Sequence, residues 1–94
     1  MEFLVRIAVR LPADMPDARK AELTAAERDY GAELRRRGAI QRIWRVPGAT
    51  RNVGIWEARD ATELHELLSG LPLFPWVDAE VTALAQHPLE AGDR

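Results

Sequence analysis

One acidic residue stands among apolar residues on a single face of a predicted helix. Residues 17–37 are rich in alanine, glutamate, leucine and arginine, and a glycine follows at Gly38, which predicts a long helix that stops there. One face of it carries residues spaced by four, three and four positions: Leu23, Glu27, Tyr30 and Leu34. A carboxylate on a packed face loses water, which raises its pKa toward the range useful for proton transfer. We predict that Glu27 is such a group; the alternative is that it lies at the rim of this face and pairs with an arginine.

Further candidates for chemistry lie in two predicted strands. Trp44 and Arg45 are adjacent, so their side chains point to opposite faces of the sheet. A guanidinium can hold a carboxylate through two parallel hydrogen bonds, but this segment contains Arg42, Arg45 and Arg51, and charge does not choose among them. Asn52 either donates to an oxygen of a ligand or belongs to the turn before its strand.

The elements that position these residues follow from alternation and from turn residues. Strands are predicted over residues 2–11, 39–46, 52–58 and 77–85, and a second helix over 61–69. Asp14 is expected to cap the long helix, and Asp60 with Glu63 to form a capping box at the second helix. The order β-α-β-β-α-β predicts an α+β, ferredoxin-like fold, an antiparallel sheet with two helices on one face. We expect one domain over residues 1–88 and a polar tail over 89–94.

Composition excludes several classes of function. The 94 residues fit one domain, and a net charge of −2 gives no reason to expect nucleic acid or membrane partners. There is no cysteine, so neither disulfides nor thiol catalysis are expected, and two isolated histidines make no metal site. No signal peptide or membrane span is apparent, which makes the cytoplasm the expected location. The small size and the apolar residues on both faces of the first strand predict a homo-oligomer formed through the free sheet face.

A rigid segment near the C-terminus carries the most specific pattern. Its residues read Leu-Pro-Leu-Phe-Pro-Trp-Val-Asp-Ala-Glu-Val-Thr-Ala-Leu over positions 71–84. Each proline fixes its φ angle, so this connection is stiff enough to wall a pocket or an interface. The segment resembles the corresponding part of muconolactone delta-isomerases. The resemblance continues without gaps over nearly the whole chain, through Trp44-Arg45-x-x-Gly48, Asn52 and Glu63-Leu64-His65.

The resemblance implies a cofactor-free isomerase of aromatic-compound catabolism, in the β-ketoadipate pathway. Such enzymes move the carbon-carbon double bond of muconolactone, a small anionic lactone with a carboxymethyl arm, to give 3-oxoadipate enol-lactone. It implies that Glu27 carries the proton, that Arg45 binds the carboxylate, and that Asn52 or a backbone N–H stabilises the developing oxyanion. The expected substrate-binding set is Tyr30, Trp44, Arg45 and Asn52. Family members assemble from dimers, up to decamers.

The sequence departs from the family pattern at four positions near the expected pocket. Leu4 and Tyr30 differ from some members, and Ala49-Thr50 replaces His-Tyr. These changes leave the exact lactone open. Two other classes also stay open: a non-catalytic oligomer that binds a small ligand, and a cyclase, isomerase or monooxygenase of a biosynthetic pathway on the same scaffold. A buried Glu27 favours an enzyme, and a solvent-exposed Glu27 favours the binder.

Overall fold

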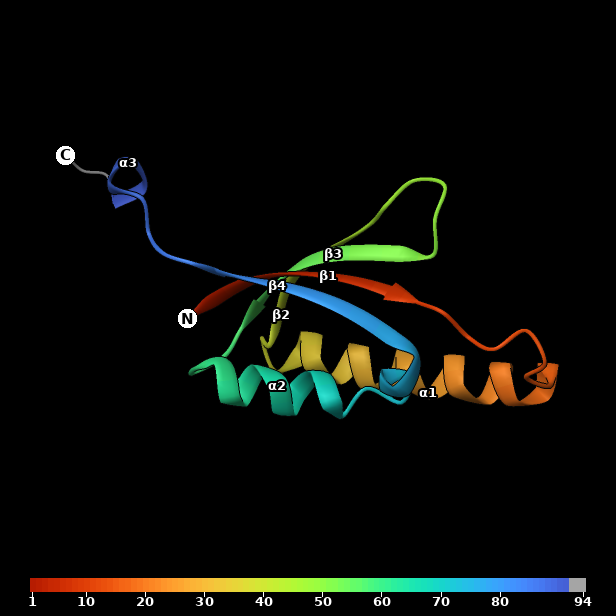
Figure 1. Ribbon diagram of the computed structural model, residues 1–94. Coiled ribbons are helices and arrows are strands. Elements are labelled where there is room, and N and C mark those ends of the chain that lie inside the picture. The colour runs from red at the N-terminus through yellow and green to blue at the C-terminus, as the bar shows by residue number, and fades with distance from the viewer. Residues whose placement is uncertain (92–94) are drawn as a thin grey trace.

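The structure, a computed structural model, describes residues 1–91 and contains one four-stranded sheet. Its elements in chain order are β1 (Glu2–Val9), α1 (Asp17–Arg36), β2 (Ile40–Arg45), β3 (Arg51–Glu57), α2 (Ala61–Ser69), the 3-10 turn η1 (Phe74–Trp76), β4 (Val77–Leu84) and α3 (Pro88–Ala91). The sheet order is β2-β3-β1-β4 with every neighbouring pair antiparallel. Both α1 and α2 lie on one face of the sheet (Figure 1). The predicted ferredoxin-like fold is confirmed, with element bounds within two residues of those expected.

The predicted polar tail is only partly described. Residues 92–94 lie outside the described residues, and Pro88–Ala91 forms the short helix α3, which stands apart from the rest of the molecule (Figure 1). No helix within residues 1–91 is long and apolar enough to cross a membrane. The cytoplasmic location stays a prediction.

The register of the sheet decides which side chains face the helices. Residues directly opposite one another in an antiparallel pair point to the same face. On β1, Phe3, Val5 and Ile7 are buried under the helices. Their partners on β3 are Trp56, Gly54 and Asn52, so these three also face the helices.

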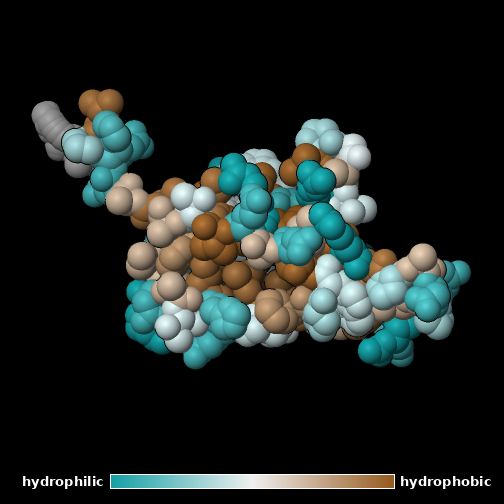
Figure 2. Space-filling model, in the orientation of Figure 1, coloured by the Kyte–Doolittle hydropathy of each residue, from teal (hydrophilic) through white to brown (hydrophobic). Residues whose placement is uncertain are grey.

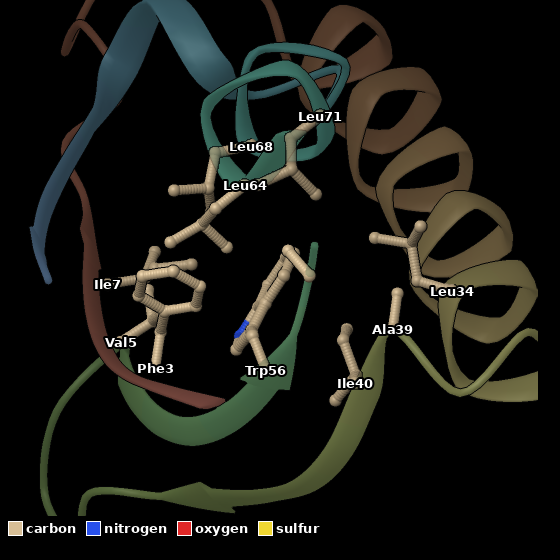
Figure 3. Packing of buried hydrophobic residues seen from close by; sticks show 11 residues of the cluster. Phe3, Val5, Ile7, Leu34, Ala39, Ile40, Trp56, Leu64, Leu68 and Leu71 are labelled. Atoms are coloured by element: carbon tan, nitrogen blue, oxygen red, sulfur yellow. The ribbon is translucent and has the colours of Figure 1, made fainter. Parts of the chain in front are cut away.

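The core lies between the sheet and the two helices (Figure 3). Its largest fully buried side chains come from three elements, and they are Trp56, Phe3, Leu34 and Val5. Leu64 and Leu68 reach down from α2 toward Phe3 and Trp56, as Figure 3 shows. Burying these apolar side chains provides the main driving force that holds the helix layer on the sheet.

The helix ends follow their sequence signals in two of three cases. Gly38 has a φ angle of 80°, and the N–H groups of Gly38 and Ala39 bond to the carbonyls of Arg35 and Leu34 at 3.1 and 2.9 Å. These two bonds form a Schellman motif that ends α1 as predicted. At α2, the Asp60 carboxylate accepts from the Glu63 N–H at 2.9 Å as predicted. The Glu63 carboxylate, however, accepts from the Arg59 N–H at 2.6 Å and not from the Asp60 N–H, so only half of the predicted capping box forms.

The expected cap at Asp14 is wrong. The N-cap of α1 is Pro16, with no side-chain cap hydrogen bond. Asp14 instead lies in a turn closed by the Met15 N–H bonding to the Pro12 carbonyl at 3.1 Å. Because the helix begins only at Asp17, the Asp14 carboxylate stands too far back to reach its first N–H groups.

A close approach between α1 and the end of α2 depends on a glycine. The Tyr30 hydroxyl donates to the Leu67 carbonyl at 2.9 Å, which satisfies one of the unpaired carbonyls at the end of α2. A Cβ at Gly70 would lie 2.4 Å from the Tyr30 hydroxyl oxygen and 3.0 Å from its ring carbon Cζ. Only the absence of a side chain at Gly70 lets Tyr30 reach α2.

We therefore predict that Gly70→Ala lowers the free energy of unfolding by about 1–3 kcal/mol, the range for overpacking. Gly31→Ala is the matched control, because a Cβ at Gly31 meets nothing within 4 Å. That change should be neutral or should stabilise the helix by up to about 1 kcal/mol. Urea unfolding of both variants measures the effect, and equal stabilities would contradict the role given to Gly70.

Candidate active site

Glu27 lies on the face of α1 that packs toward the sheet. Leu34 on this face is fully buried, and Leu23, Glu27 and Tyr30 are half-buried, whereas Arg28 beside them is exposed. The predicted stripe is confirmed. Its C-terminal end packs in the core, so Glu27, two turns earlier, lies where the core gives way to partly solvated space.

One backbone group holds the Glu27 carboxylate. The Leu73 N–H donates to Glu27 Oε1 at 3.0 Å in a partly buried setting. Leu73 is 7% exposed and directly precedes η1. Pro72 and Pro75 stiffen this connection, because each proline fixes its φ angle. The predicted rigid wall is therefore the element that orients the acidic side chain.

Burial raises the pKa of the Glu27 carboxyl above 4.5, and the Leu73 hydrogen bond lowers it by a smaller amount. The desolvated carboxylate is consequently a stronger base than an ordinary glutamate. Among residues 1–91, no arginine lies within ion-pair distance of Glu27. Glu27 thus lies at the edge of the core, as the alternative supposed, but it lacks the arginine partner that the alternative required.

Arg45 and Asn52 come together at one end of the sheet. They are direct partners across β2 and β3, and Asn52 also faces Ile7, which lies under the helices. Both side chains therefore belong to the side of the sheet that holds Glu27. Asn52 Oδ1 is buried with no hydrogen-bond partner, while the exposed Arg45 Nη1 donates to the Arg51 carbonyl at 3.3 Å. A buried unpaired amide oxygen is costly, so this atom marks a place for a donor from a ligand or water.

A bulge in β2 decides which arginine reaches this side. The register shifts between Ile40 and Arg42. Ile40 is buried toward the helices, yet Arg42 pairs with Ile55 on the outer face. One extra residue therefore reverses the alternation, and it turns Arg45 rather than Trp44 toward the helices.

The other two candidate arginines lie on the outer face. The Arg42 guanidinium stacks 4.8 Å from the centre of the Trp44 ring, and Arg51 pairs with Ala8. Trp44 is 44% exposed on this outer face. Within one chain the sheet separates Trp44 from Glu27, so its expected role as a contact of the same ligand is not supported by this geometry.

A groove of about 730 Å³ opens near this end of the sheet. Asn52 lines it together with charged residues that include Arg10 and Asp78, which form an ion pair at 3.3 Å. Its lining does not include Glu27. Most of its lining, such as Ala8 and Arg51, belongs to the outer face of the sheet, so the groove lies beside Asn52 but not over Glu27.

The structure changes one expectation from the sequence and adds one group that the sequence did not predict. The Tyr30 hydroxyl has its partner within the protein, the Leu67 carbonyl, so the first role of Tyr30 is to pack α1 against α2. The Leu73 N–H was not among the predicted site groups. A backbone donor has no side-chain signature, and the only signal was the pair of prolines that flank it.

Comparisons with known proteins find relatives along nearly the whole chain. The sequence model of one family, muconolactone delta-isomerase, matches residues 1–90. A muconolactone Delta-isomerase of Cupriavidus pinatubonensis is 46% identical over 88 residues, which cover 94% of this chain and 96% of that protein. One of Acinetobacter baylyi is 40% identical over 93 residues, covering 99% and 97%.

Solved structures give the same result for the fold. A crystal structure of muconolactone isomerase superposes with a TM-score of 0.91 at 35% identity, over 100% of this chain and 98% of that one. A 5-chloro-2-hydroxyhydroquinone dehydrochlorinase of Burkholderia phenoliruptrix superposes with a TM-score of 0.69 at 21% identity, covering 93% and 96%. The second likeness concerns the fold alone.

Proposed function

Since the chain belongs to the muconolactone delta-isomerase family, we propose that Glu27 is the single proton carrier of a double-bond isomerisation. The activity is that of the family, isomerisation of muconolactone in aromatic-compound breakdown. The observation that carries the proposal for Glu27 is its half-buried carboxylate, held at one oxygen by the Leu73 N–H.

The isomerisation needs a base that removes a proton from the substrate and later returns it to another carbon. The Glu27 carboxylate removes a proton from one carbon of the unsaturated lactone, and the electron pair spreads toward the lactone oxygen. The resulting acid then returns the proton to a second carbon, and the double bond has moved. The proton count balances within the substrate, and no co-reactant is consumed. The Leu73 N–H holds Oε1, which leaves Oε2 as the oxygen that carries the proton.

Arg45 and Asn52 supply the polar groups of the opposite wall. Arg45 is the one of the three candidate arginines on the helix-facing side, so we assign it to the carboxylate arm of the lactone. Asn52 is assigned to the lactone oxygen, where negative charge develops and to which its amide N–H groups can donate. The half-buried Glu27 disfavours a non-catalytic binder. A cyclase on this scaffold would use the same acidic residue, Glu27, on a different substrate.

We further propose that a second copy of the chain covers the outer sheet face. Apolar side chains gather at the middle of the molecule, where the sheet layer meets the helix layer (Figure 2). Two exposed apolar residues lie on the outer face of the edge strands, Trp44 on β2 at 44% and Leu84 on β4 at 36%. On the outer face, Leu4, Val53 and Ile55 are only half-buried. A chain of this size gains from covering such a surface.

Light scattering should accordingly give a mass of at least two chains at micromolar concentration. Trp44→Glu places a charge on the outer face that the second copy would cover, and it should lower that mass. Glu22→Gln, on the exposed side of α1, is the control that should leave the assembly unchanged. A monomeric wild-type protein would contradict the assembly.

The catalytic prediction concerns Glu27→Gln. Glutamine keeps the shape and can still accept from the Leu73 N–H, but it cannot take up a proton. We expect kcat for muconolactone to fall about 10²–10⁴-fold with little change in KM or in circular dichroism. Glu22→Gln serves again as the control, and a Glu27→Gln variant with wild-type kcat would remove Glu27 from the mechanism.

The pH dependence of the wild-type enzyme tests the same group independently. Glu27 must be ionised to act as the base, and its pKa is raised by desolvation. Activity should therefore be lost as the pH falls through that raised value. The acidic limb of the kcat/KM profile should lie above 4.5, the ordinary value for glutamate. An acidic limb at or below that value would argue for another base.

Arg45→Ala tests the carboxylate anchor. Because a remote anchor holds substrate and transition state alike, the variant should raise KM about 10- to 100-fold and change kcat little. Arg42→Ala is the matched control, since Arg42 lies on the outer face over Trp44. An equal effect of both changes would point to general electrostatics rather than to a specific anchor.

A further inference from the structure

The chain contains a single lysine, Lys20, and every other one of its 13 basic residues is an arginine. Lys20 stands on α1 seven residues before Glu27. Seven residues are nearly two helical turns, so the two side chains share one face at a separation of about 10 Å along the axis. Lys20 is half-buried, whereas the neighbouring Arg19 and the next basic residue, Arg28, are exposed. The face that carries the acid therefore also carries a cation.

Lys20 has no ion pair within residues 1–91. A lysine whose stem is partly buried on this face keeps its ammonium group at the edge of the face, where it can pair with an anion. Leu23 lies between Lys20 and Glu27 on the same face and is also half-buried. The sequence of groups along this face is thus a cation, an apolar side chain and a basic carboxylate.

This order matches the order of groups in the lactone. We propose that Lys20 binds the carboxylate arm of the substrate while the lactone ring lies over Leu23 with its reactive carbons at Glu27. This inference rests on the function proposed above and adds a second positioning cation to it. Arg45 approaches from the sheet and Lys20 from the helix, and a carboxylate has two oxygens with lone pairs enough for both.

The type of residue suits this position. A lysine is a compact point charge on a flexible stem, so it can follow the arm without imposing a fixed plane. An ammonium group that merely covered Leu23 with its stem would leave binding indifferent to its charge. The two roles therefore differ in a measurable way.

The kinetic test uses Lys20→Met, which keeps the length of the apolar stem and removes the charge. We expect KM for muconolactone to rise about 10- to 100-fold with kcat little changed, and Lys20→Arg to recover part of the loss. Arg19→Met, which removes an exposed charge from the adjacent position, should leave KM unchanged. A Lys20→Met enzyme with wild-type KM would overturn the proposal.

A binding test separates this inference from the proton transfer. Reductive methylation with ¹³C-formaldehyde labels only two kinds of amine in the wild-type protein, Lys20 and the α-amino group of Met1, which is paired with Glu57. A saturated lactone with the carboxymethyl arm cannot isomerise, so its binding does not depend on Glu27 chemistry. It should shift the Lys20 methyl signal and leave the Met1 signal in place, while its uncharged methyl ester should shift neither.

The role of Lys20 and the role of Glu27 can be refuted independently. The role of Lys20 is overturned if its methyl signal does not shift with the saturated lactone acid, or if it shifts equally with that compound and with its methyl ester. A Glu27→Gln variant that remains active overturns the proposed base but leaves a shifted Lys20 signal meaningful, because that signal reports binding alone.

Discussion

The hydrogen bond from the Leu73 N–H to Glu27 Oε1 is the contact on which the site depends. It joins the middle of α1 to a turn 46 residues further along the chain. Each side is positioned by other means: α1 by Leu34 in the core and by Tyr30 at the end of α2, and the turn by its two prolines. The fold therefore delivers one oxygen of the acid to a fixed donor, and the proposed proton transfer falls to the other oxygen.

Two opposing effects set the basicity of that acid. A carboxylate that loses its water binds a proton more tightly, and a donor to its charged form weakens that binding. For Glu27 the first effect is the larger one. A single N–H is enough to orient the group but not enough to replace the lost water, and a second donor or an arginine partner would move the pKa in the opposite direction. The lack of an arginine beside Glu27, within the residues that the structure describes, thus suits a base.

The sequence predicted the parts of the fold that depend on local signals. Gly38 ends α1, Asp60 caps α2, and the stripe through Glu27 faces the sheet, because each of these follows from spacing along one element. It did not predict the bulge after Ile40, which is a property of the pairing between β2 and β3. Strict alternation from the buried Ile40 would have placed Trp44 toward the helices, so the facing of Arg45 could be known only from the paired strands.

The departures from the family pattern can be sorted by what each residue does in the structure. The Tyr30 hydroxyl is bonded to the Leu67 carbonyl and packs against Gly70, so this change is used in joining the two helices and adds no free polar group to the helix wall. Ala49 and Thr50 occupy the turn between β2 and β3, directly before the strand that carries Asn52. Of these three changes, the one on α1 thus serves the packing of the two helices, whereas the two in the turn stand next to the strand that carries Asn52.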